Sequence, residues 1–108
     1  MNDTFPKAVA IKLADIIDYA AGGVVSKQIL KNEKGNITLF SFDKGQGLSE
    51  HTAPFNAFVQ VLEGVGEIVI DKQAILVETG ESIIMPANIS HAVNAVESFK
   101  MLLTMIKD

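Results

Sequence analysis

The sequence predicts a single all-β domain, and three observations support this prediction. The chain has 108 residues, the length of one domain, and 48% of them are hydrophobic, which is enough for a buried core. Eight segments of four to eight residues have the apolar patterns of strands. Turns that contain glycine, proline or Asp-Lys separate most of these segments. Short strands at close spacing are typical of a β-sandwich or a closed barrel.

Along the chain, the spacing of apolar residues changes once, from that of a helix to that of strands. Residues 1–6 are expected to form a flexible arm that ends at Pro6. Residues 11–21 have a pattern that suits one short helix, ended by Gly22 and Gly23. The predicted strands are residues 24–30, 37–42, 56–62, 67–70, 74–77, 82–85, 91–96 and 99–106. No linker, repeat or low-complexity tract divides the chain, so residues 1–108 are expected to form one domain.

Two glycine pairs are interpreted as turns. Residues 45–47 and 64–66 each read Gly-X-Gly, and strand-like sequence follows both of them. A phosphate-binding loop needs the N-terminus of a helix directly behind its glycines. We therefore expect no nucleotide-binding loop at either position.

The residue types that are absent exclude several kinds of chemistry. The chain has no Cys, no Trp and no Arg, and its only histidines are His51 and His91. The lack of Cys excludes disulfides, thiolate nucleophiles and Cys-based metal sites. The lack of Arg removes the usual bidentate partner of phosphate and carboxylate groups. Acid–base or metal chemistry that uses imidazole must therefore depend on these two residues.

Charge and hydropathy exclude two classes of partner. The net charge is −4, and the lysines are scattered along the chain with no basic stripe, so we expect no nucleic-acid partner. No segment approaches the ~18 apolar residues of a membrane helix, so no membrane partner is expected. The first residues lack a basic segment before an apolar one. We therefore expect no signal peptide and a cytoplasmic domain.

Two segments carry spacings that resemble the paired motifs of the cupin superfamily. In residues 45–64, Gly45, His51 and Gly64 stand in the register of the first motif. In residues 80–95, the positions that fit the second motif are Gly80, Pro86 and His91. The resemblance implies a small bacterial cupin, with a double-stranded β-helix or jelly-roll barrel over residues 35–106. It also implies a homodimer.

The departures from the motifs fall on the metal ligands of the family. Metal-binding cupins hold Fe, Mn, Ni or Zn with three His and one Glu. In this chain the second His of the first motif falls on Ala53 and the Glu falls on Ala57, so only His51 and His91 remain. The second motif also departs, with Asn88 at its Gly position and Ala95 at its Asn position. Two imidazoles seldom hold a divalent ion tightly, so the sequence disfavours a bound metal.

Strand alternation gives no replacement ligand. If His51, Ala53 and Ala57 point into the barrel, then Val59 shares their face and Glu50 points outward. Loss of the larger ligands at the two alanine positions is expected to leave a wide, apolar cavity. The expected lining combines these positions with methionines that adapt to irregular space, namely Ala53, Ala57, Val59, Met85 and Met101.

Three functions remain open at this point. The chain could bind a small molecule in the barrel near His51 and His91. It could instead be a metal-dependent enzyme, such as a dioxygenase, isomerase or decarboxylase, with a reduced ligand set. It could also be a structural or regulatory dimer whose barrel is filled by side chains. The sequence identifies no catalytic residue and no substrate, because a fold of this kind hosts many activities.

Overall fold

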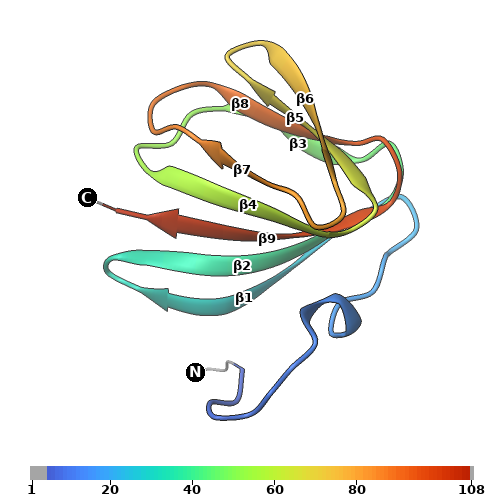
Figure 1. Cartoon of the computed structure of the whole chain (residues 1–108), viewed down its shortest axis with the longest axis vertical. Coiled ribbons are helices and arrows are strands. Elements are labelled where there is room, and N and C mark those ends of the chain that lie inside the picture. Colours follow the sequence, from blue (N-terminus) through green and yellow to red (C-terminus); the bar gives the residue numbers. More distant parts are fainter. Residues whose placement is uncertain (1–4, 108) are drawn as a thin grey trace.

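The structure, a computed structural model, describes residues 5–107, and most of them lie in β-strands. A short 3-10 turn precedes nine strands in this part of the chain (Figure 1). In chain order the elements are η1 (Leu13–Asp15), β1 (Val24–Asn32), β2 (Gly35–Phe42), β3 (Gly47–His51), β4 (Asn56–Glu63), β5 (Val65–Ile70), β6 (Gln73–Glu78), β7 (Ser82–Met85), β8 (His91–Ala95) and β9 (Phe99–Ile106). Within the described range, no helix has the length and apolar character needed to cross a membrane.

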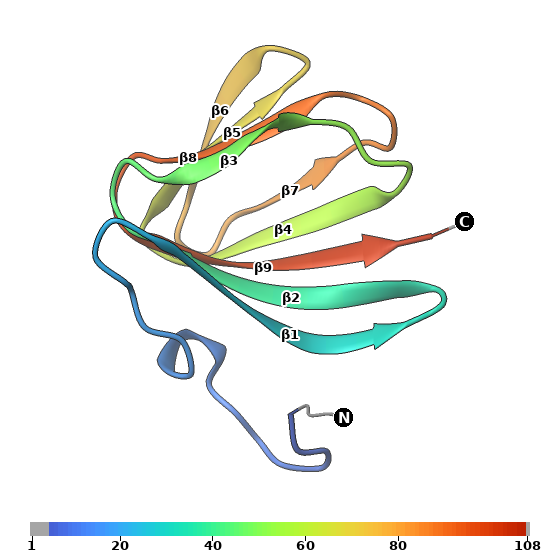
Figure 2. The same ribbon diagram turned by 180° about the vertical axis from the view of Figure 1, so that it is seen from behind.

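The strands form two antiparallel sheets that face each other. One sheet has the order β1-β2-β9-β4-β7 and the other has the order β3-β8-β5-β6. Neighbours such as β2 and β9 are far apart in the sequence, as crossing connections between two sheets require. The two sheets come together at one end of the molecule and spread apart at the other (Figures 1 and 2). This arrangement confirms the predicted all-β jelly-roll barrel.

The buried core lies between the two sheets and is continuous along their facing sides. Phe42 and Phe99 are fully buried, and their rings stack with centroids 4.8 Å apart. A Cβ atom at Gly66 would lie 2.6 Å from the Phe99 ring, so this packing requires glycine. The residues of the core, which share the inward faces of their strands, are Phe42, Ala57, Val59, Val61, Ile68, Val77, Met85, Val93, Ala95, Phe99, Met101 and Leu103.

Side-chain alternation along β4 agrees with the predicted inward and outward faces. Ala57, Val59 and Val61 are buried, whereas Phe58 between them is 38% exposed.

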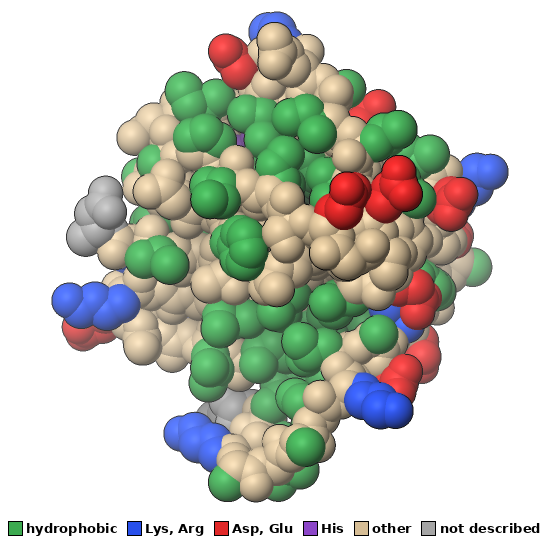
Figure 3. All heavy atoms as spheres, viewed as in Figure 1, with side chains coloured by type: hydrophobic (Ala, Val, Ile, Leu, Met, Phe, Trp, Pro, Cys, Tyr) green, Lys and Arg blue, Asp and Glu red, His purple; other side chains and the backbone are tan. Residues whose placement is uncertain are grey.

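Exposed apolar side chains are common on this molecule. Figure 3 shows hydrophobic side chains across the middle of one face, with most of the visible charged side chains toward its margins.

The sequence interpretation missed β3, which supplies one of the two histidines. The sequence after the turn at residues 45–47 was described as strand-like, but no strand was assigned to it. In the structure β3 shows no buried alternation. Gly47 in fact begins the strand. A Cβ atom at this position would lie 2.0 Å from the carbonyl oxygen of Val93, so glycine permits β3 to approach β8 closely.

The N-terminal helix is much shorter than predicted. A helix over residues 11–21 was expected, but only η1 forms, and the chain then runs without regular structure to residue 23. Ile17, in this irregular stretch, is only 1% exposed, so the segment packs against the protein without being helical. Of the predicted N-terminal arm, residues 1–4 lie outside the described residues.

Side chains of the five-stranded sheet explain why the helix does not continue. In a helix each carbonyl accepts a hydrogen bond from a backbone N–H four residues later. Here the carbonyls of Ala14, Ile16 and Asp18 instead accept hydrogen bonds from side chains. Their donors are Lys100 Nζ at 2.6 Å, Lys27 Nζ at 2.7 Å and Ser41 Oγ at 2.8 Å.

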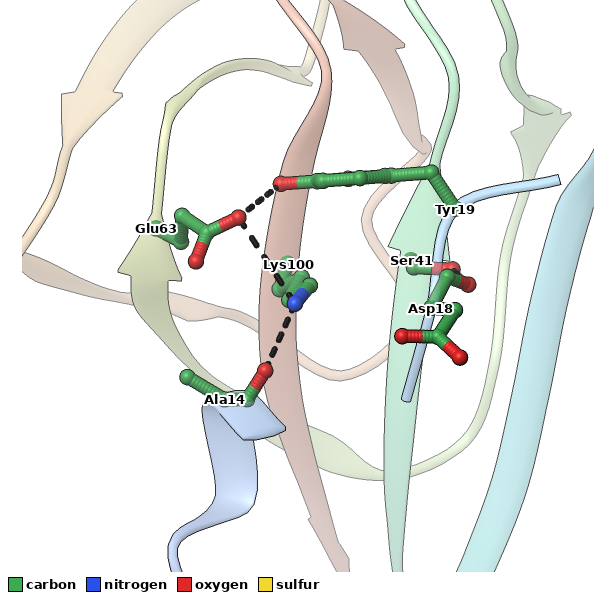
Figure 4. A network of polar contacts seen from close by, with 6 residues as sticks. All are labelled: Ala14, Asp18, Tyr19, Ser41, Glu63 and Lys100. Carbon is green, nitrogen blue, oxygen red and sulfur yellow. Dashed lines mark hydrogen bonds and ion pairs between the residues drawn. The ribbon is translucent and has the colours of Figure 1, made fainter. Parts of the chain in front are cut away.

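Figure 4 shows Lys100 at the centre of this attachment, between the Ala14 carbonyl and the Glu63 carboxylate. Tyr19 donates its phenol hydrogen to the same carboxylate at 2.5 Å. Burial, and then the hydrogen bond and charge of Glu63, raise the pKa of Tyr19 well above its ordinary value, which keeps the phenol protonated as the donor. Polar contacts therefore fix the N-terminal segment to the sheet.

Candidate functional site

A cavity of about 200 Å³ lies between the two sheets, toward the end where they spread apart. Nine of its lining residues are apolar and two are histidines. They are Phe40, Leu48, His51, Ala53, Ala57, Met85, His91, Val93, Met101, Leu103 and Met105. The register of β9 explains the position, because Phe99 begins this strand in the filled core and Met105 lies near its other end at the cavity. Side chains therefore do not fill the whole barrel.

The two histidines meet at this cavity although they are 40 residues apart. His51 ends β3 and His91 begins β8, and these two residues are opposite each other in the antiparallel pair. Their Nε2 atoms are 3.2 Å apart, and their rings are nearly perpendicular, with an interplanar angle of 75°. His91 is 5% exposed, whereas His51 is exposed, so the pair extends from the interior of the barrel to its surface.

Backbone carbonyls fix the tautomer of both rings. The Nδ1 atom of His51 lies 2.6 Å from the carbonyl oxygen of Ser49, and the Nδ1 atom of His91 lies 3.3 Å from that of Ile89. A carbonyl oxygen can only accept a hydrogen bond, so these contacts favour the tautomer with hydrogen on Nδ1, most strongly in His51, where the distance is shorter. In the neutral form, both Nε2 atoms are then acceptors whose lone pairs face each other.

The surroundings of His91 favour its neutral form. Burial and the neighbouring His51 lower the pKa of His91 below its ordinary value of 6.5, and the Ile89 carbonyl only partly opposes this shift. A neutral Nε2 atom in an apolar cavity can accept a hydrogen bond or take up a proton. The pair can therefore hold one hydrogen atom or one proton between its rings.

Four of the five residues expected to line the pocket lie around the same cavity as the histidines. They are Ala53, Ala57, Met85 and Met101. The fifth, Val59, is fully buried and is not among the lining residues. Val59 shares the inward face of β4 with Ala57 but lies one pleat further toward the filled core.

Phe40, Leu103 and Met105 lie in predicted strands, at residues 37–42 and 99–106, but were not among the residues expected to line the pocket. Sequence reasoning missed Leu48 entirely, because β3 was not predicted and its pairing with β8 shifts between Leu48 and His51. This irregularity turns two residues of opposite parity toward one cavity. Simple alternation along a sequence carries no signal for such a shift.

Glu50 does not complete a ligand set, as alternation predicted. Its Oε2 atom accepts a hydrogen bond from Ser90 Oγ at 3.0 Å and pairs with Lys72 Nζ at 3.4 Å on the surface. These contacts lower the pKa of Glu50, with the hydrogen bond from Ser90 as the larger cause. Ser90 thus points away from the cavity while its neighbour His91 points into it.

The donor set does not fit the resident metal ion that the resemblance would imply. The 3.2 Å spacing of the two Nε2 atoms is compatible with two ligands of one ion. A catalytic metal site, however, needs about three protein ligands, and the other lining side chains are apolar. Within residues 5–107 there is no group of three or more His, Asp or Glu side chains placed to hold a metal. The positions that could supply the missing donors are Ala53 and Ala57.

Comparison with known proteins agrees with this architecture. Residues 38–107 match the model of the cupin domain family. A conserved protein of unknown function from Streptococcus pyogenes is 36% identical, with a TM-score of 0.93 over 98% of this chain and 93% of that chain. A cupin superfamily protein from Desulfitobacterium hafniense is 27% identical, with a TM-score of 0.91 over 98% of this chain and 97% of that one.

A third solved structure is of a longer chain. It is a cupin 2 conserved barrel domain protein from Leptotrichia buccalis, 42% identical, with a TM-score of 0.88 over 90% of this chain. This chain covers 47% of that protein, about half of its length. Among curated proteins, none matches the sequence. The family match covers more than half of the residues, and the fold and motif spacing agree with it, so this chain belongs to the cupin family.

Proposed function

We propose that this cupin binds a small, largely apolar molecule in its barrel, with the polar group of that molecule against His51 and His91. The observation that carries the proposal is the cavity itself. It is about 200 Å³ in volume, and its wall is apolar except for the two imidazoles. Binding sites for small molecules are typically apolar spaces with a few placed polar groups.

The loss of two family ligands supports binding over metal-dependent catalysis. Ala53 and Ala57 replace long polar side chains with methyl groups on the cavity wall. This replacement widens the space and removes the donors that a metal would need. The same two positions therefore argue for an apolar ligand and against a resident ion.

A substitution that fills the cavity tests the proposal. Ala57 is 3% exposed and faces the cavity, so Ala57→Leu adds three carbon atoms to the space. Ala74→Leu makes the same change at an exposed position on β6 and is the matched control. Binding of p-xylene, an apolar probe of suitable size, can be followed by ¹³C NMR of the methionine methyl groups in the cavity.

The expected result is saturable p-xylene binding to the original protein and to Ala74→Leu, with a loss of about tenfold or more in Ala57→Leu. Chemical-shift changes should be confined to Met85, Met101 and Met105, which line the cavity. If p-xylene shifts none of these methyl resonances, or if Ala57→Leu binds it unchanged, the proposal is wrong.

A further inference from the structure

We infer that the ligand of the cavity is a small monocyclic phenol, whose hydroxyl donates its hydrogen to the paired Nε2 atoms of His51 and His91. This inference rests on the proposed function and adds the chemical class of the ligand. Four features of the cavity carry it: the tautomers of the two rings, the lack of other polar lining groups, the volume, and the methionines.

The two imidazoles require a hydrogen-bond donor. Their Nδ1 hydrogens are directed at the carbonyl oxygens of Ser49 and Ile89, at 2.6 and 3.3 Å. The two Nε2 atoms are 3.2 Å apart. When both rings are neutral and carry their hydrogens on Nδ1, both Nε2 atoms are acceptors, and the hydrogen between them must come from a third group. An unpaired buried acceptor is costly, so a ligand that donates one hydrogen is favoured over one that only accepts.

The rest of the wall limits the ligand to a single polar group. The nine lining residues other than the histidines have no hydrogen-bonding side chain. Within residues 5–107 no lysine or carboxylate lines the cavity, so a cationic ligand would lose its hydration without gaining an ion-pair partner. An anionic ligand would need a protonated imidazole, and burial of His91, which lowers its pKa, disfavours that form. A phenol has one hydroxyl and remains neutral near pH 7, because phenols ionise near pH 10.

The volume fits one six-membered ring. An apolar cavity of about 150 Å³ in another protein takes up benzene. The cavity of about 200 Å³ here has room for a benzene ring with one or two small substituents. Bicyclic ligands would require the barrel to expand.

The methionines favour an aromatic ring over an aliphatic one. The chain has four methionines, and three of them, Met85, Met101 and Met105, line this cavity together with Phe40. Thioether sulfur atoms contact aromatic rings favourably, typically near the ring edge. A ring bound among these side chains would gain contacts that an alkyl chain of equal volume would not.

Three probes of nearly equal size separate hydrogen donation from simple burial. The donor p-cresol carries a hydroxyl, its isomer anisole carries an ether oxygen that only accepts, and p-xylene has no polar atom. Each can be titrated into the protein while the methyl resonances of Met85, Met101 and Met105 are followed. We expect p-cresol to bind about tenfold or more tightly than p-xylene, with anisole the weakest of the three.

Variants of the two histidines test whether the preference comes from this pair. His51→Phe and His91→Phe retain a ring but remove an acceptor nitrogen. Each should weaken p-cresol binding about tenfold and leave p-xylene binding within about twofold. Because His91 is buried and His51 is exposed, His51→Phe keeps the test valid if His91→Phe does not fold.

The outcomes distinguish this inference from the proposed function. If p-xylene or anisole binds as well as p-cresol, the phenol assignment is wrong while the binding cavity stands. The same holds if p-cresol binds both histidine variants unchanged. If none of the probes binds, the proposed function fails and the assignment fails with it.

Discussion

The Nε2 atoms of His51 and His91 lie 3.2 Å apart because the last residue of β3 is opposite the first residue of β8. A backbone carbonyl lies beside the Nδ1 atom of each ring, and within residues 5–107 neither ring is hydrogen-bonded to a carboxylate. Two mutually facing imidazoles beside an apolar cavity form a site that responds to hydrogen donors and to protons.

Acidification is expected to destabilise the fold through His91. Burial and the neighbouring His51 lower the pKa of His91 in the folded protein, whereas the unfolded chain has the ordinary value of 6.5. The unfolded state therefore binds more protons below pH 6.5, and the free energy of unfolding decreases as the pH falls through that value. At pH 7.5 and above, this contribution to stability is fully present.

Urea unfolding between pH 8 and pH 5 measures this effect. The midpoint should decrease below pH 6.5 in the original protein, and this decrease should be smaller in His91→Phe. Lys31→Met, at an exposed position on β1 in the other sheet, is a control that should retain the original pH profile. An identical profile for His91→Phe and the original protein would contradict the assignment.

The fold was largely predictable from sequence because alternation and turn residues are local signals. The core positions of β4 and β9 follow from parity alone, as Ala57, Val59 and Met101 show. The short N-terminal helix was predicted over residues 11–21, but only η1 forms. Its apolar pattern is local, whereas the side chains that bind its carbonyls, above all Lys100, are distant in the sequence. Local propensity does not encode a competing contact made 86 residues away.

The site was only partly predictable, for a similar reason. Motif spacing identified His51 and His91, but the irregular β3–β8 pairing that turns Leu48 inward is a property of two strands together. The hydrogen bonds that set the tautomers also depend on the folded backbone. The homodimer and the cytoplasmic location that the sequence suggested remain predictions.

Gly47 is expected to control the position of His51. A Cβ atom at Gly47 would lie 2.0 Å from the carbonyl oxygen of Val93, so Gly47→Ala must push β3 away from β8. We expect a loss of about 1–3 kcal/mol in stability and weaker probe binding. The control is Gly23→Ala, whose added Cβ meets Ala20 Cβ at an ordinary 3.5 Å and should change stability by less than about 0.5 kcal/mol. Thermal unfolding of the two variants tests this prediction. A loss of stability in Gly47→Ala alone supports displacement of β3, whereas equal losses in both variants would mean that alanine is tolerated at neither glycine.

Lys100 is expected to hold the N-terminal segment in place. Its side chain is 9% exposed, donates to the Ala14 carbonyl and pairs with Glu63 at 3.6 Å. Lys100→Met should cost about 1–3 kcal/mol because it leaves the Ala14 carbonyl without its donor and Glu63 without its ion-pair partner. Lys72→Met removes a lysine that is 79% exposed and should cost less than about 0.5 kcal/mol.

Hydrogen exchange distinguishes a local effect of Lys100 from a global one. In Lys100→Met, amides of residues 13–19 should exchange faster while those of β4 and β9 keep their order of protection. Equal acceleration throughout both sheets would mean that Lys100 supports the core and not the segment.

A metal site is expected to appear when the two missing ligands are supplied. The double variant Ala53→His and Ala57→Glu adds an imidazole and a carboxylate to the cavity that already contains His51 and His91. Three imidazoles and one carboxylate form a complete set for Zn²⁺ or Fe²⁺. Without metal, the added carboxylate lies at a position that is 3% exposed in the original protein and should lower stability.

Zinc should then raise the melting temperature of the double variant, because the ion binds only the folded site, and should leave that of the original protein unchanged. Elemental analysis after dialysis should find about one zinc per chain in the variant. One equivalent retained by the original protein and lost in His91→Ala would instead show that two imidazoles suffice.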